Sequence, residues 1–294
     1  MQSTFWTNTI WYVLLGIVTL VELVFTMIKA QKRKLTFAFF LSVLGITLHY
    51  ELMILIFLKG YTYYPMIIKN ATTPFDDVLS GNLFSQFAIA TTVLLVTVMN
   101  LKYYWYIVFA LAYGAIEELF ISLGVYTQNW YCTWMTVLVL PFAFWISKKM
   151  YLAIIKGVKP ITYYLYVYLG LFPLHIITII WGLMLAGYLE YSRTLLSDPI
   201  SSRHFMAMLN FFMLLIPMML IYFSKMKWAW KVLIVLITYL IYYLGCKLNL
   251  ILIRDQWFLA VSTVTILWMY LSILAMDKLY GGFQKRTDRL DRAK

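Results

Sequence analysis

The chain has 294 residues, of which 63% are hydrophobic and only 12% are charged. This composition leaves too little polar surface for a soluble domain of that length, and it excludes one. The net charge of +12 would suit a nucleic-acid partner, but the Lys and Arg residues lie in short stretches between apolar runs, where membrane proteins carry them. We therefore expect the lipid bilayer as a partner, and no nucleic acid.

Apolar segments recur along the whole chain. Each is close to the roughly 20 residues that a helix needs to cross about 30 Å of hydrocarbon. In chain order they cover residues 8–28, 35–58, 81–101, 103–124, 131–152, 161–189, 204–224, 228–248 and 257–277. The predicted fold class is an all-α polytopic membrane protein with about nine transmembrane helices.

The basic residues predict how these helices are oriented. Of the 24 Lys and Arg residues, 18 follow the odd-numbered segments or lie in the carboxyl-terminal tail, and six lie on the other side. Cytoplasmic loops carry the excess of Lys and Arg, so we expect a cytoplasmic carboxyl terminus and an external amino terminus. The first basic cluster follows the first apolar segment, so we expect that segment to be an uncleaved anchor and not a signal peptide.

The order of the segments suggests an internal repeat. Residues 35–156 and 161–280 each contain four segments that enter from the same predicted side, so they would form two parallel four-helix repeats. Residues 1–34 would add an extra helix with a basic cytoplasmic loop, and residues 281–294 a basic cytoplasmic tail. Parallel repeats occur in transporters, whose sites lie between the repeats, and also in proteins that transport nothing.

Short residue matches link the two repeats. Leu48-His49 corresponds to Leu174-His175, and the other matched segments are Ser80–Phe84 with Ser201–Phe205, Leu101–Trp105 with Met226–Trp230, and Asn129-Trp130 with Gln256-Trp257. The null explanation is chance similarity between apolar helices. Recurrence at an offset of 121 to 127 residues favours duplication.

Five ionisable residues within the segments form a candidate polar cluster, because a charge facing lipid costs roughly 2.5 kcal/mol or more. They are His49, Glu51, Glu117, Glu118 and His175. His49, Glu117 and His175 each lie about 21 Å from the predicted cytoplasmic start of their helix. The two histidines would face each other if the repeats pack around a central axis. Neighbouring members of the cluster point about 100° or 200° apart on their helices, so not all five can converge.

Four interpretations of this cluster stay open: a structural hydrogen-bond network, a proton or cation pathway, a metal site, and acid-base catalysis. No H-E-x-x-H spacing identifies a metal, so the metal and any cofactor are unknown. No Ser, Cys or Thr motif identifies a nucleophile, and we assign no catalytic residue. Glu22 in the first segment is expected to pair with a neighbouring helix.

Two further pairs of residues lie near predicted outer helix ends. Asp76 and Asp77 belong to the longest external loop, residues 59–80, and would attract a cation at an entrance or only complement the dipole of the next helix. Cys132 and Cys246 would form an external disulfide if their Cα atoms lie within about 7 Å, or remain free thiols.

The first half resembles a group of small five-helix membrane proteins of uncharacterised function from endospore-forming bacilli. The resemblance covers residues 8–156, and the motifs that carry it are Tyr64-Pro65, Gln86, Asn100, Glu117–Phe120, Leu123–Tyr126 and Asn129-Trp130 with Trp134. It implies a bacterial cytoplasmic membrane as location, and no activity. The second half would be an appended, diverged copy.

The leading functional hypothesis is transport or conduction of a small solute or cation through a cavity between the two repeats. A membrane scaffold or sensor subunit, acting through a protein partner or as a homo-oligomer, is the first alternative. An intramembrane enzyme that uses His and Glu in acid-base chemistry is the second.

Overall fold

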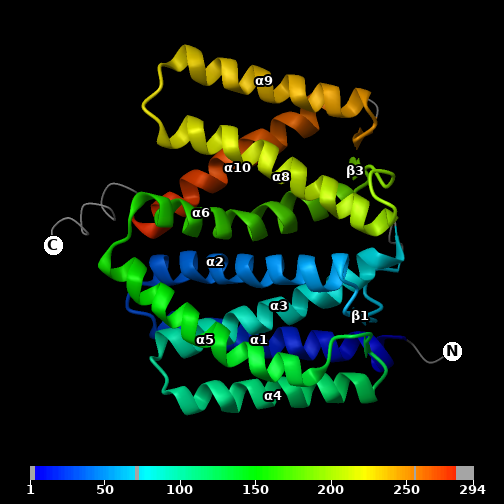
Figure 1. Ribbon diagram of the computed structural model, residues 1–294, viewed down its shortest axis with the longest axis vertical. Coiled ribbons are helices and arrows are strands. Elements are labelled where there is room, and N and C mark those ends of the chain that lie inside the picture. Colours follow the sequence, from blue (N-terminus) through cyan, green and yellow to red (C-terminus); the bar gives the residue numbers. More distant parts are fainter. Residues whose placement is uncertain (1–3, 70–72, 255, 283–294) are drawn as a thin grey trace. The chain divides into compact units, whose positions relative to one another are not determined.

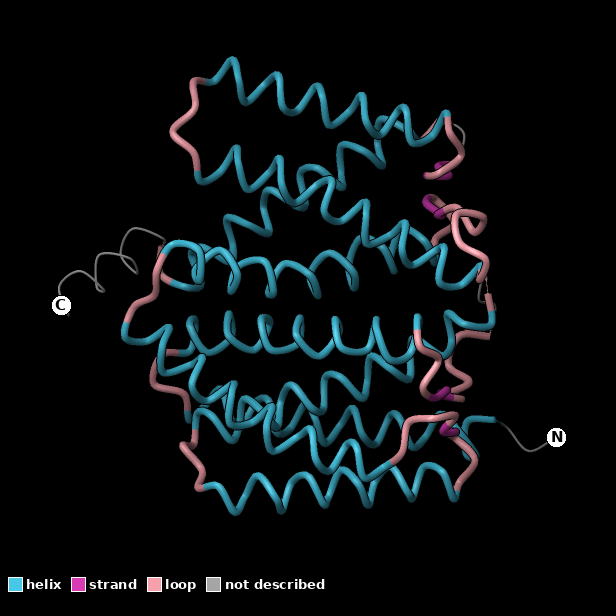
Figure 2. The backbone as a smooth tube through the Cα atoms, in the orientation of Figure 1, coloured by secondary structure: helices cyan, strands magenta, loops and turns pink. Residues whose placement is uncertain are grey.

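A computed structural model describes residues 4–69, 73–254 and 256–282 (Figures 1 and 2). Among these residues nine helices are long and apolar enough to cross a membrane, which fits an all-α membrane protein. These spans are Phe5–Lys29, Arg33–Phe57, Pro74–Val98, Tyr103–Ser122, Thr133–Lys156, Pro160–Leu185, Pro199–Phe223, Trp228–Lys247 and Phe258–Tyr280. Most of the predicted basic tail, residues 283–294, lies outside the described residues.

The spans contain ten α-helices and three π-helical segments, and short strands lie between some of them. The α-helices are α1 (Ile10–Lys29), α2 (Arg33–Glu51), α3 (Pro74–Val98), α4 (Tyr103–Ser122), α5 (Thr133–Lys156), α6 (Pro160–Leu174), α7 (Gly182–Leu185), α8 (Pro199–Phe223), α9 (Trp228–Lys247) and α10 (Phe258–Tyr280). The π-helical segments are η1 (Phe5–Thr9), η2 (Leu52–Phe57) and η3 (His175–Trp181). The strands are β1 (Tyr61–Tyr63), β2 (Tyr126–Gln128), β3 (Leu189–Tyr191) and β4 (Ile251–Ile253).

The chain divides into two compact units, Met1–Tyr166 with Leu279–Lys294 and Val167–Lys278. In the first unit, α3 packs against α1, α2 and α5, and α4 packs along α5 (Figure 1). The contact with α1 is close: a Cβ atom on Gly16 would lie 2.7 Å from the ring of Phe84, so α1 approaches α3 only because this residue is glycine.

Helix α3 begins seven residues earlier than the apolar pattern predicts. Thr73 and Asp76 form a capping box at its amino terminus, and Pro74 occupies the first turn, where its missing N–H removes no hydrogen bond. A polar first turn is invisible to a hydropathy pattern but stable as helix. Asp76 and Asp77 therefore belong to α3, and not to the predicted loop.

Two short strand pairs are present that the sequence did not predict. In the first unit, β1 follows η2 and pairs antiparallel with β2, which follows α4, so that Tyr61 lies opposite Gln128 and Tyr63 opposite Tyr126. In the second unit β3 and β4 pair in the same manner. Three-residue strands carry too little pattern to be recognised, yet their backbone hydrogen bonds fix the loops over the helix ends.

The second unit holds a buried ion pair between its strands and α8. Helix α8 begins with Asp198 as N-cap, whose side chain accepts a hydrogen bond from the Ser201 amide. One turn later, Arg203 is 3% exposed and pairs with Glu190 of β3 at 2.6 Å from Nε to Oε1. Glu190 also pairs with the more exposed Arg193 at 3.1 Å.

We expect Arg203→Ala to lower the free energy of unfolding by about 3 kcal/mol, because it leaves the Glu190 carboxylate without its buried partner. Arg193→Ala removes the exposed partner of the same carboxylate, and such pairs contribute about 1 kcal/mol or less. Thermal unfolding of both variants in one detergent measures the difference. Equal losses would contradict a structural role for the Arg203 pair.

Candidate functional site

A cavity of about 310 Å³ lies inside the first unit. Helices α1 to α5 and the strands β1 and β2 all contribute to its wall, and most of its lining side chains are apolar or aromatic. All of its lining residues lie between Tyr12 and Ser147. A largely apolar hollow with a few polar groups is the common form of a small-molecule site.

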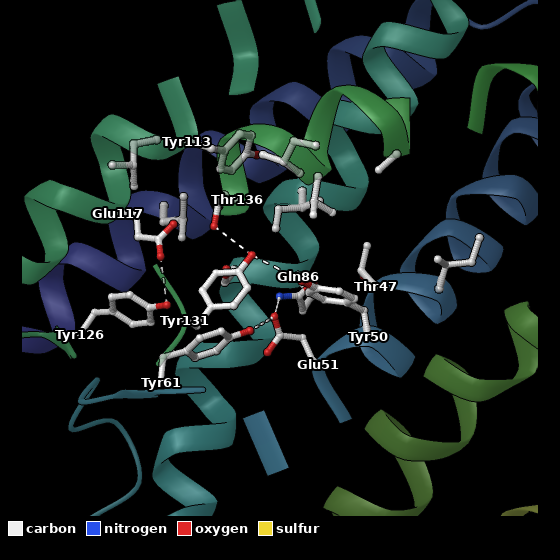
Figure 3. Close-up of a pocket in the computed structure, with 18 of the residues that line it drawn as sticks. Thr47, Tyr50, Glu51, Tyr61, Gln86, Tyr113, Glu117, Tyr126, Tyr131 and Thr136 are labelled. Atoms are coloured by element: carbon white, nitrogen blue, oxygen red, sulfur yellow. Dashed lines mark hydrogen bonds between the residues drawn. The ribbon is translucent and has the colours of Figure 1, made fainter. Parts of the chain in front are cut away.

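Glu51 is the most deeply buried acid in this cavity. It is the last residue of α2, and its side chain is 4% exposed. Its Oε1 atom accepts hydrogen bonds from the Tyr61 hydroxyl at 2.5 Å and from Gln86 Nε2 at 2.6 Å (Figure 3). Its Oε2 atom is buried and has no hydrogen-bond partner among the described residues. A buried polar atom without a partner is costly, so it marks Glu51 as a candidate functional residue.

Glu117 is the second acid in the wall and lies in the last two turns of α4. Its Oε1 atom accepts a hydrogen bond from the Tyr126 hydroxyl at 3.1 Å (Figure 3). It accepts a second from Gln128 Nε2 at 2.8 Å, and both donors belong to β2. Gln128 Nε2 also donates to Thr133 at 2.9 Å. The strand pair thus supplies donors to both acids.

Tyrosines form the side of the cavity near the strands. The ring of Tyr61 lies 5.4 Å from that of Tyr126 and 5.2 Å from that of Tyr131, between centroids. The ring of Tyr63 lies 5.1 Å from that of Tyr126. Burial raises the pKa of Tyr61 and Tyr126, and nearby acidic and phenolic groups raise it further. Both hydroxyls therefore stay protonated and act as hydrogen-bond donors to the acids.

Among the described residues that line the cavity, two are acids, Glu51 and Glu117, and none is Lys, Arg or His. The described residues also contain no group of three or more His, Cys, Asp and Glu that could hold a metal ion. The arrangement can accept a positive charge, and it offers no basic side chain for an anion.

A second polar chain begins at the cavity and continues along α1 and α3. The hydroxyl of Tyr113, which lines the cavity, lies 2.9 Å from the hydroxyl of Thr92. Thr92 in turn donates to the Glu22 carboxylate at 3.1 Å. As expected from the sequence, Glu22 pairs with a neighbouring helix.

Only two of the five clustered residues predicted from the sequence line the cavity, namely Glu51 and Glu117. Glu118 is exposed, because one residue of helix turns it about 100° away from Glu117. His49 is half-buried, and its Nδ1 atom lies 2.6 Å from the carbonyl oxygen of Gly45 on its own helix.

His175 belongs to the second unit. Its ring packs against Phe211 at 5.3 Å between centroids, and its side chain is 1% exposed, with no hydrogen-bond partner for either ring nitrogen among the described residues. That it faces His49 stays a prediction.

The candidate entrance acids bind the protein's own backbone. Asp77 accepts hydrogen bonds from the amides of Met66, Ile67 and Ile68 at 2.8 to 2.9 Å. Asp76 accepts one from the Thr73 amide at 2.9 Å. Both carboxylates therefore order the loop before α3.

The two cysteines, Cys132 and Cys246, are both free thiols in the structure. The external disulfide considered from the sequence is not formed in it. Cys132 lies in the first unit and Cys246 in the second.

Sequence reasoning did not assign Gln86, Tyr61 or Tyr131 to the site. Gln86 offered a signal, since an amide inside a transmembrane segment needs a partner. The tyrosines offered none, because Tyr is expected at any membrane interface. No family model, curated protein or solved structure matches this chain.

Proposed function

We propose that this protein is a multi-pass protein of a bacterial cytoplasmic membrane that binds a small cation in the cavity of its first unit and conducts it across the bilayer. The observation that carries the proposal is the set of acids in the cavity: two carboxyl groups, one with an unpartnered oxygen, and no basic side chain among the described residues of the wall. An intramembrane carboxylate without a partner is a functional-site signal. The cavity is built from the first unit alone, so the proposal does not depend on a passage between the repeats.

The depths of the polar side chains support conduction over binding alone. At 1.5 Å per helical residue, Glu22 lies about 10 Å from the basic end of α1 and Tyr113 about 15 Å from the start of α4. Glu117 lies about 21 Å along α4, and Glu51 about 27 Å along α2. Polar groups therefore occur at successive depths across most of the hydrocarbon, as a pathway requires.

We also propose that residues 35–156 and 161–280 are parallel repeats. Helices α3 and α8 both have 25 residues, α4 and α9 both have 20, and each pair is separated by 125 positions. The amide of Tyr64 donates to the Val125 carbonyl, and the amide of Ser192 donates to the Leu250 carbonyl, so the strands close alike. At this offset Ser80 corresponds to Phe205. The sequence match of Ser80–Phe84 with Ser201–Phe205 therefore differs from the structural alignment by four residues.

Under this alignment the second repeat lacks the acids of the cavity. Gln86 corresponds to Phe211, and Glu117 corresponds to Tyr242. Phe211 packs on the His175 ring where the first repeat has the hydrogen bond from Gln86 to Glu51. The proposed cation site therefore belongs to the first repeat, and the second repeat would serve as scaffold.

The proposed orientation has an external amino terminus. In a variant without Cys132 and Cys246, Thr127→Cys introduces an exposed thiol on β2, and Lys32→Cys introduces one in the loop after α1. A membrane-impermeant maleimide should label the first variant in intact cells and the second only after permeabilisation. The reverse pattern would invert the topology.

We expect purified protein in liposomes to take up radiolabelled rubidium or choline faster than empty liposomes. Glu51→Gln and Glu117→Gln should each reduce this uptake about tenfold or more, since a hydrogen bond to a charged group contributes roughly 1.5–3 kcal/mol. Glu118→Gln is the matched control, because it removes the neighbouring, exposed carboxylate and should leave uptake unchanged. Uptake of both cations that is insensitive to Glu51 and Glu117, or no uptake at all, would refute the conduction proposal.

A further inference from the structure

We infer that the cation is an organic ammonium ion, held between the Glu51 carboxylate and the tyrosine rings of the cavity. This inference rests on the proposed function and narrows it to one ligand class. Three features of the cavity support it: its volume, its aromatic wall and the carboxyl group of Glu51.

The volume suits a molecule larger than a bare metal ion. A cavity of about 310 Å³ falls at the lower end of the range of small-molecule sites, which begins at roughly 300 Å³. A divalent ion in protein would need about six oxygen ligands at 2.0–2.6 Å. Among the described lining residues only Glu51 and Glu117 carry a carboxyl group, and the remaining wall is mainly carbon.

The aromatic wall supplies the second element of recognition. Tyrosine faces attract cations through the ring quadrupole, and cages of such rings bind quaternary ammonium groups. Tyr61, Tyr126 and Tyr131 all line the cavity. The hydroxyls of Tyr61 and Tyr126 are already engaged by Glu51 and Glu117. What these two tyrosines offer a ligand is therefore chiefly their rings.

The unpartnered oxygen of Glu51 supplies the third element of recognition. Its Oε1 atom is saturated by Tyr61 and Gln86, whereas its Oε2 atom has no partner among the described residues. An ammonium group in the cavity would bring a positive charge near the Glu51 carboxyl group and would leave the hydrogen bonds of Tyr61 and Gln86 to Oε1 in place. Its alkyl groups would contact the apolar part of the wall. An inorganic ion would make no such apolar contact.

The direct test compares choline with 3,3-dimethylbutan-1-ol, a neutral molecule of the same shape in which carbon replaces nitrogen. Calorimetric titration of the purified full-length protein in detergent should show saturable binding of choline. The neutral analogue should bind about tenfold more weakly or worse, because it gains neither the ionic nor the cation–π contact. Potassium and rubidium at the same concentrations should not displace choline.

Variants separate the contribution of the ring from that of the hydroxyl and from folding. Tyr131→Phe keeps the aromatic face and should retain choline binding, whereas Tyr131→Leu should weaken it about tenfold. Glu51→Gln should abolish binding, and Glu118→Gln should not change it. Thermal unfolding of each variant without ligand identifies any that lose their fold.

The outcomes distinguish the inference from the proposal beneath it. Rubidium uptake that needs Glu51, without choline binding, would overturn the ammonium assignment and leave the cation pathway standing. Equal binding of choline and its neutral analogue would overturn the ammonium assignment, since recognition would then not depend on charge, and rubidium uptake would decide the cation pathway separately. If Tyr131→Phe and Tyr131→Leu changed choline binding equally, the ring would make no cation–π contact with the ligand. That result would contradict the assignment.

Discussion

The pairing of β1 with β2 is the interaction on which the candidate site depends. It joins the loop after α2 to the loop after α4 and places Tyr61, Tyr126 and Gln128 beside the acids of two helices. Glu51 and Glu117 lie within the candidate spans, where a carboxyl group without such donors would lack a hydrogen-bond partner. The strands are three residues long, so their hydrogen bonds alone hold little. The buried rings of Tyr61, Tyr63 and Tyr126 also pack against one another, at 5.1 to 5.6 Å between centroids, and this burial adds to their stability.

This arrangement leaves an electrostatic imbalance that the protein does not correct internally. Every hydroxyl or amide that reaches Glu51 and Glu117 is a neutral donor, and a neutral donor stabilises a carboxylate without cancelling its charge. The second unit solves the same problem differently, because Glu190 there has the guanidinium groups of Arg203 and Arg193. A buried acid with a basic partner is sufficient for structure. The acids of the first unit lack one among the residues that line the cavity, and for that reason we assign them to function.

The architecture was largely predictable from the sequence, and the site only in part. Nine spans follow from hydropathy, because length and apolar content alone determine whether a helix can cross the bilayer. Whether Glu117 or its neighbour Glu118 faces inward depends on the rotation of α4, and that helix is apolar on all sides. The partner of Glu51 is equally hidden, since Gln86 lies 35 residues away on another helix. Which side chains come into contact depends on how the helices pack. A single sequence carries no periodic signal for that packing.

The two histidines illustrate why equal depth in the membrane does not by itself indicate that two side chains lie close together. His49 and His175 occupy corresponding positions in the two proposed repeats, and both lie close to a π-helical segment, where the backbone deviates from regular hydrogen bonding. In the first unit, the polar role near this segment is carried two residues later by Glu51, which Tyr61 and Gln86 engage. In the second, His175 is instead buried against Phe211. If both repeats descend from one ancestor, the irregular segment was retained while its side chains changed. The same irregular backbone segment would then lie beside the candidate ligand site in one repeat and within a hydrophobic core in the other.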